Sequence, residues 1–214
     1  MSGLFLKDLL LMGKRRQSLL VFLGIMAVMG FSMGGVFLIG YGTMLFGIFA
    51  VGSLSYDDFD NCMPFLLTLP VTRRQYVLGK FLFSASGVAL GWVMSIIVST
   101  IVSIIKSEEI LILNSALVVI TLLPVFIAII SIWIPIEIKF GIEKSRTVMA
   151  VAVGCVFLLG LLANKVLPYS PASAIDAINA APTVLVIGII IAVCLVILTV
   201  TYTITCRILE NREY

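Results

Sequence analysis

The sequence predicts an all-α integral membrane protein with six transmembrane helices and an N-terminal amphipathic helix in the membrane interface. Three observations support this fold class. Hydrophobic residues make up 61% and charged residues 12% of the 214 residues, whereas soluble domains average about 45–50% and about 25%. The apolar residues form uncharged runs that are long enough to cross a bilayer. The basic residues between these runs fall almost entirely on one side of the predicted membrane, and lipid is therefore the expected solvent for most of the chain.

Residues 1–16 are expected to form the interfacial helix. On a helical wheel the side chains separate into two faces, with Phe5, Leu6, Leu9, Leu10 and Met12 on one and Lys7, Asp8, Lys14 and Arg15 on the other. A cleavable signal peptide would place its basic cluster before its apolar run, and here the order is reversed. The pattern is typical of a helix that lies on the membrane surface and leads into the first span.

Six spans are predicted at about 17–34, 36–55, 77–105, 110–134, 147–164 and 183–206. One span needs about 20 residues, so the uncharged stretch between Arg16 and Asp57 predicts two short spans rather than one. Gly34 and Gly35 supply a turn between them. Pro124 falls inside the fourth span, where membrane helices tolerate proline if neighbouring groups satisfy the freed backbone.

The segment between the fifth and sixth spans is predicted to lie on the outer surface. Ser170 and Pro171 match the cap and the first residue of a helix, and Pro182 closes the segment before the last span. We expect a short helix at about 171–180, with an irregular surface loop as the alternative.

The basic residues predict the orientation of the spans. If both termini, the segment 56–80 (which contains the loop 56–76) and the loop 135–146 are cytosolic, 12 basic residues lie inside: Lys7, Lys14, Arg15, Arg16, Arg73, Arg74, Lys80, Lys139, Lys144, Arg146, Arg207 and Arg212. The outside keeps 2, Lys106 and Lys165. Cytosolic loops of membrane proteins carry the excess of Lys and Arg. We therefore predict a multi-pass protein of the cell (plasma) membrane with cytosolic N- and C-termini.

Several function classes are excluded by what the sequence lacks. It contains no histidine, and its four cysteines show no metal-ligand spacing, so neither a catalytic centre nor a metal site is expected. The interiors of the spans carry no Asp, Glu, Lys or Arg, which ion-coupled carriers usually need. No phosphate-binding G-x-x-x-x-G-K-[ST] loop is present, so no cofactor is expected in this chain. Any energy for transport must come from another protein.

Two G-x-x-x-G motifs, Gly30–Gly34 and Gly87–Gly91, mark positions where helices can approach closely. They fit either an interface between subunits or packing within one bundle. The motif alone does not distinguish these alternatives in a glycine-rich chain.

The first cytosolic loop, 56–76, combines acidic, apolar and basic segments. Carboxylates at 57, 58 and 60 favour a helix N-terminus, and the apolar stretch that follows predicts a short amphipathic helix at about 57–69 that stops at Pro70. Thr72 and Gln75 then match a capping box for a new helix that runs into the third span. The alternative places the short helix on the lipid headgroups, with Arg73 and Arg74 on phosphates.

The second cytosolic loop, 135–146, is short, carries both signs of charge and has a hinge at Gly141. It could simply connect two spans. Two structured and charged cytosolic loops on an otherwise uncharged bundle instead indicate docking of a soluble partner.

Both loops resemble segments of a known family. The run from Leu66 to Lys80, LLTLPVTRRQYVLGK, and the run from Pro135 to Arg146, PIEIKFGIEKSR, are similar to the two cytosolic segments of short six-span ABC exporter permeases, especially those that export phenol-soluble modulins. The resemblance covers essentially the whole chain and implies one transmembrane permease domain, 1–214, in which the 57–69 helix is a cytosolic coupling helix.

The resemblance also implies partners. These are two copies of a separate ATP-binding cassette ATPase that holds ATP and Mg, a second permease chain in a homodimer or heterodimer, membrane lipid, and an amphipathic or hydrophobic peptide as exported cargo. A nucleic-acid partner is not expected. The alternative function is a non-transporting membrane module that binds or sequesters peptides in an assembly or immunity role.

The ATPase would dock on an apolar centre with a charged edge, which is the usual build of an interface. The predicted docking residues are Phe65, Leu66, Leu69, Pro70, Thr72, Arg73, Arg74, Phe140, Gly141, Glu143, Lys144 and Arg146.

Overall fold

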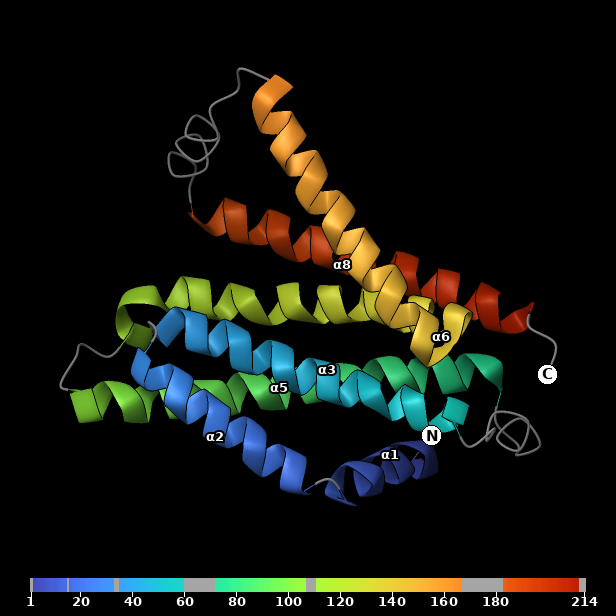
Figure 1. The fold of residues 1–214 in the computed structure, drawn as a ribbon, viewed down its shortest axis with the longest axis horizontal. Coiled ribbons are helices and arrows are strands. Elements are labelled where there is room, and N and C mark those ends of the chain that lie inside the picture. The colour runs from blue at the N-terminus through green and yellow to red at the C-terminus, as the bar shows by residue number, and fades with distance from the viewer. Residues whose placement is uncertain are drawn as a thin grey trace.

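The computed structural model describes residues 2–14, 16–32, 35–59, 72–106, 111–166 and 183–211. The described part is all-helical, which confirms the predicted class, and contains the helices α1 (Ser2–Lys14), α2 (Arg16–Ser32), α3 (Gly35–Phe59), α5 (Arg73–Lys106), α6 (Leu111–Val166) and α8 (Thr183–Glu210). Figure 1 shows α3, α5 and the first half of α6 running roughly alongside one another, with α8 crossing on one side and α1 and α2 on the other.

Four of these helices contain segments that are long and apolar enough to cross a membrane: Gly35–Leu54, Arg73–Lys106, Ala116–Gly141 and Leu185–Glu210. The apolar part of α2 is shorter, Gln17–Gly30, and the 17-residue helix is about 25 Å long at a rise of about 1.5 Å per residue. A hydrocarbon core is about 30 Å thick. A multi-pass membrane protein is therefore supported, and six spans remain a prediction.

The predicted loop 135–146 is helical in the structure, because α6 continues through it. The chain changes direction at Gly141, whose φ is 72°, and Figure 1 shows α6 turning at the end of the bundle before its second half leaves at an angle. A single glycine can adopt this left-handed conformation without the clash that a side chain would cause. Helical backbone on both sides of the turn satisfies its own polar groups, which an open loop near lipid would leave unpaired.

One helix boundary differs from the prediction. Helix α3 runs to Phe59, so Asp57 and Asp58 lie in its last turn and do not begin a new helix. Helix α5 begins at Arg73, directly after the predicted cap Thr72, and runs into the predicted third span. The predicted coupling helix beyond residue 59 and the predicted surface helix at 171–180 lie outside the described residues.

Glycines allow α3 and α5 to pack closely. A Cβ added at Gly87 would overlap the Cβ of Ala50, and one added at Gly91 would lie 2.9 Å from Phe46 Cγ and 3.3 Å from the carbonyl oxygen of Gly42. The Gly87–Gly91 motif therefore serves packing within the bundle, which was one of the two alternatives. The partner of Gly30 in the other motif, Gly34, lies outside the described residues.

An apolar cluster closes one end of the bundle. It joins the end of α3, the beginning of α5, the region of α6 before its turn and the end of α8 through buried residues that include Leu54, Tyr76, Val77, Ile138 and Leu209. Because these four helices meet here, the polar residues around the cluster are held in fixed positions. We refer to this region as the base of the bundle.

Candidate functional site

Helix α5 begins at the base of the bundle with the predicted capping box. The backbone N–H of Gln75 donates to Thr72 Oγ1 at 3.3 Å, and the backbone N–H of Thr72 donates to Gln75 Oε1 at 3.2 Å. This reciprocal pair satisfies two amides that a helix start otherwise leaves unpaired. The capping box is thus confirmed.

The two arginines of this turn reach the end of α8. Arg73 Nη1 donates to the carbonyl oxygens of Leu209 at 2.9 Å and Glu210 at 2.7 Å. The last carbonyls of a helix have no partner within it, so Arg73 caps α8. Arg74 Nε forms an exposed ion pair with Glu210 Oε1 at 2.9 Å. Both arginines were predicted at the rim of a docking surface, and the structure gives each a contact within the chain.

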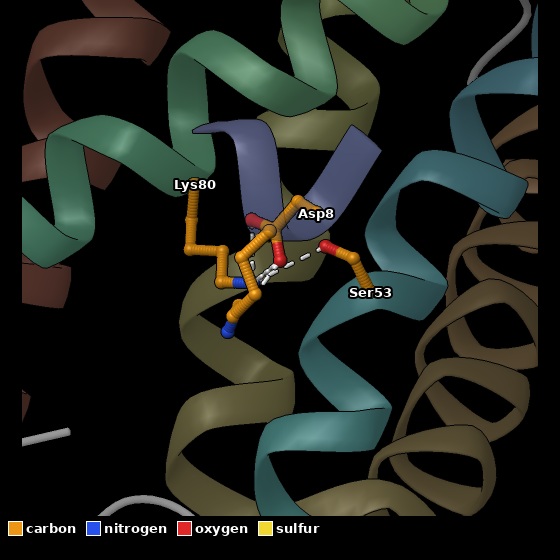
Figure 2. A network of polar contacts seen from close by, with 4 residues as sticks. Asp8, Ser53 and Lys80 are labelled. Atoms are coloured by element: carbon orange, nitrogen blue, oxygen red, sulfur yellow. Dashed lines mark hydrogen bonds and ion pairs between the residues drawn. The ribbon is translucent and has the colours of Figure 1, made fainter. Parts of the chain in front are cut away.

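A buried ion pair connects α1 to the base of the bundle. Lys80 Nζ donates to both carboxylate oxygens of Asp8 at 2.8 Å and to Ser53 Oγ at 3.3 Å, and Figure 2 shows the three side chains converging from α5, α1 and α3. Asp8 and Lys80 are each only 2% exposed. Lys80 Nζ also lies 5.6 Å from the ring centroid of Tyr76, and Lys7 Nζ lies 3.6 Å from Asp8 Oδ1.

The position of Asp8 corrects the sequence interpretation. The helical wheel grouped Asp8 with Lys7, Lys14 and Arg15 on the charged face of α1, whereas the structure buries Asp8 against α3 and α5. A charge removed from water is costly unless an opposite charge or several hydrogen bonds compensate for it. Lys80 provides Asp8 with both, and Ser53 accepts a further hydrogen bond from Lys80. The opposite face of α1 is exposed through Leu6, Leu9 and Leu10.

The residues around the turn of α6 form the second part of the candidate site. Phe140 is half-exposed with Lys139 Nζ 5.3 Å from its ring centroid, and Lys144 and Arg146 are exposed. Ile138 shares the apolar cluster of the base with Tyr76 and Val77. The turn and the start of α5 therefore lie at the same end of the molecule.

Several predicted docking residues are not described. Phe65, Leu66, Leu69 and Pro70 lie outside the described residues, as does the side chain of Glu143. Docking at Thr72, Arg73, Arg74, Phe140, Gly141, Lys144 and Arg146 remains a prediction, and the structure shows only that these residues share one end of the bundle.

Hydroxyl groups inside the spans bond to their own helices. Thr43 donates to the Ile39 carbonyl, Ser95 to that of Gly91 and Ser131 to that of Ile127, each at 2.6 Å. Such bonds satisfy the hydroxyl without a partner on another helix. Within the described ranges, no group of three or more His, Cys, Asp or Glu residues could hold a metal ion.

Comparison with known proteins identifies the family. A family model described as ABC-2 family transporter protein matches residues 3–210. None of the curated proteins matches the chain. The matched residues include nearly all of α1, the base of the bundle and α8. The chain therefore belongs to the ABC-2 transporter family and is the transmembrane subunit of an ABC transporter that works with an ATPase partner.

Proposed function

We propose that this subunit exports amphipathic or hydrophobic peptides by alternating access, driven by a separate ATP-binding cassette ATPase. The observation that carries the proposal is the family match over residues 3–210 in a sequence that has no phosphate-binding loop of its own. The peptide cargo and the outward direction rest on the similarity of 66–80 and 135–146 to permeases of phenol-soluble modulin exporters. The transporter would contain two permease chains and two ATPase copies.

The proposed orientation places the base of the bundle in the cytosol. Basic residues gather near this end, namely Lys7, Arg73, Arg74, Lys80, Lys139, Lys144, Arg146 and Arg207, whereas Lys106 ends α5 at the opposite end. This distribution supports cytosolic termini because positive charge favours the cytosolic side.

Force from the ATPase would enter through the segment 57–69 and the turn of α6. This segment leads directly to the capped start of α5, and Arg73 joins that start to the end of α8. A push on the segment would therefore act on two membrane helices at once. Apolar residues such as Leu66 and Leu69 have little reason to face water unless a partner covers them.

Co-purification of the ATPase tests this coupling site. Replacing Leu66 and Leu69 together by Asp should detach the ATPase from a permease that still purifies as a folded membrane protein, and Leu66→Met with Leu69→Met is the matched control that should retain it. If the segment instead lies on lipid, the Asp variant will insert poorly, and the ATPase bound per folded permease will equal that of the unmodified protein. That result would exclude 57–69 as the docking segment.

Reconstitution tests the cargo. In proteoliposomes that contain permease and ATPase, a synthetic amphipathic helical peptide should stimulate ATP hydrolysis and should move across the membrane. A hydrophilic peptide of equal length is the control. A permease that binds the amphipathic peptide but never co-purifies with an ATPase would favour the sequestering module, and equal stimulation by both peptides would contradict the proposed cargo.

A further inference from the structure

A buried polar cluster formed by Asp8, Lys80 and Ser53 joins helix α1 to the bundle (Figure 2). We infer that this cluster is a rotational anchor, which fixes α1 about its own axis so that Leu6, Leu9 and Leu10 face the acyl chains of the adjoining lipid leaflet. The inference depends on the membrane location of the protein and not on its cargo or its ATPase. The anchor and the proposed export function can therefore be refuted independently of one another.

Helix geometry links the anchor to the leucines. Successive residues of an α-helix are about 100° apart around its axis, so Leu6 and Leu10 each lie about 160° from Asp8. When the Asp8 carboxylate points to Lys80, these two leucines must point away from the bundle. They are 56% and 60% exposed, and Leu9, nearer to the flank, is 49% exposed.

The energetics of a buried ion pair explain why such an anchor specifies one rotation. The desolvation of two charges largely offsets their attraction, so the pair adds little to the net stability of folding. Any rotation of α1 that separates the two groups would leave a charge buried without its partner, which is strongly unfavourable. An apolar contact of the same size would hold α1 in place but would tolerate several rotations.

Lipid is the occupant that the surrounding surface indicates. The next helix, α2, exposes Leu20, Val21 and Val28, and an apolar helix surface of a membrane protein faces acyl chains. The exposed leucine face of α1 precedes this surface in the chain, and an amphipathic helix buries such a face at the boundary between headgroups and acyl chains. The exposed apolar surfaces of α1 and α2 would thus both contact the lipid acyl chains.

A nitroxide label at position 10 tests the anchor. The Leu10→Cys protein is labelled in a background whose four native cysteines are replaced by Ser or Ala, and it is placed in phosphatidylcholine–phosphatidylglycerol nanodiscs. Paramagnetic resonance then measures the collision of the label with oxygen, which partitions into lipid, and with a water-soluble nickel chelate. We expect high oxygen and low nickel accessibility for the intact pair, and a loss of this difference in Asp8→Asn. Arg74→Ala is the matched control, because it removes an exposed ion pair at the same end of the molecule. The label in this variant should retain high oxygen and low nickel accessibility.

The double variant Asp8→Lys with Lys80→Asp keeps the experiment decisive if Asp8→Asn fails to fold. It should fold and restore the lipid signature, because it recreates the ion pair in reverse. A swap that folds but leaves the label in water would overturn the inference. So would a label on the unmodified protein that meets nickel as readily as oxygen, or one shielded from both reagents by a second copy of the chain. If the label at position 10 kept its oxygen and nickel accessibility in a folded Asp8→Asn protein, Asp8 would not be the anchor of α1.

Discussion

The close approach of α3 and α5 makes Gly87→Ala a sharp test of the fold. The new methyl group would overlap the Cβ of Ala50, nearer than the 3.0 Å that real Cβ atoms respect. Carbon atoms in contact need about 3.5–4.0 Å, so the two helices must separate by more than about 0.5 Å. Both atoms are attached directly to helical backbone, and no rotamer change can relieve the contact.

The expected loss of stability follows from this overlap. Overpacking of a tight interior costs about 1–3 kcal/mol. For a chain of this length about 1 kcal/mol corresponds to about 2–4 °C in melting temperature. The melting temperature of the purified Gly87→Ala protein should therefore fall by about 2–12 °C. Because membrane proteins often unfold irreversibly, all variants need the same heating rate.

Two further variants show whether the overlap is the cause. The double variant Gly87→Ala with Ala50→Gly moves the methyl group from α3 to α5, so the gap between the two helices again holds a single methyl group. The number of helical glycines is unchanged, and most of the lost stability should therefore return. Gly188→Ala on α8 is the control, since its added Cβ meets nothing within 4 Å and the higher helix propensity of alanine should leave the melting temperature equal or higher. Wild-type melting of Gly87→Ala, or a double variant as unstable as the single one, would refute the packing argument.

Four other predictions follow from the base of the bundle and its orientation. Arg73→Met removes the Nη1 group that donates both hydrogen bonds to the last carbonyls of α8 and should cost about 1.5–3 kcal/mol. Hydrogen exchange over 205–211 should become faster, whereas Arg74→Ala should leave that exchange unchanged. Thr72→Ala removes the cap and should cost about 1 kcal/mol in thermal unfolding, whereas Thr72→Ser should cost little. Gly141→Ala forces a side chain to adopt a φ of 72° and should cost about 1–2 kcal/mol, with Gly141→Asn better tolerated; equal melting temperatures for the two would contradict a strained turn. Cysteines introduced at positions 35, 108 and 175 should react with a membrane-impermeant reagent from outside and one at position 75 should not, and external labelling at 75 would overturn the orientation.

The features that the sequence predicted correctly depend on neighbouring residues. The capping box of α5 joins Thr72 to Gln75, three residues away, and Gly141 was recognised as a hinge because glycine alone permits such a turn. The all-helical class followed from composition and apolar runs. Local spacing carries this kind of information because the interacting groups are fixed by one helix turn.

The features that the sequence could not supply depend on distant residues. Lys80 and Asp8 are 72 residues apart, and Arg73 and Leu209 are 136 apart. No periodicity relates such positions, so the sequence predicted neither the Asp8–Lys80 ion pair nor the cap that Arg73 provides for α8. Asp8 is the acidic residue on an otherwise basic helix face, and this exception could have indicated a special role for it. Its partner Lys80, however, becomes evident only when α1, α3 and α5 are packed together.

The distance between Asp8 and Lys80 along the chain also determines the order of events during synthesis. Ribosomes add about 5–20 residues per second, so the 72 residues between the two positions take about 4–14 s. Throughout this interval the ammonium group of Lys80 does not yet exist, so the Asp8 carboxylate cannot be buried against it. The exposed Leu6, Leu9 and Leu10 would hold α1 at the bilayer until then. Docking of the first helix is accordingly a late step of biogenesis, completed only after α5 has been inserted.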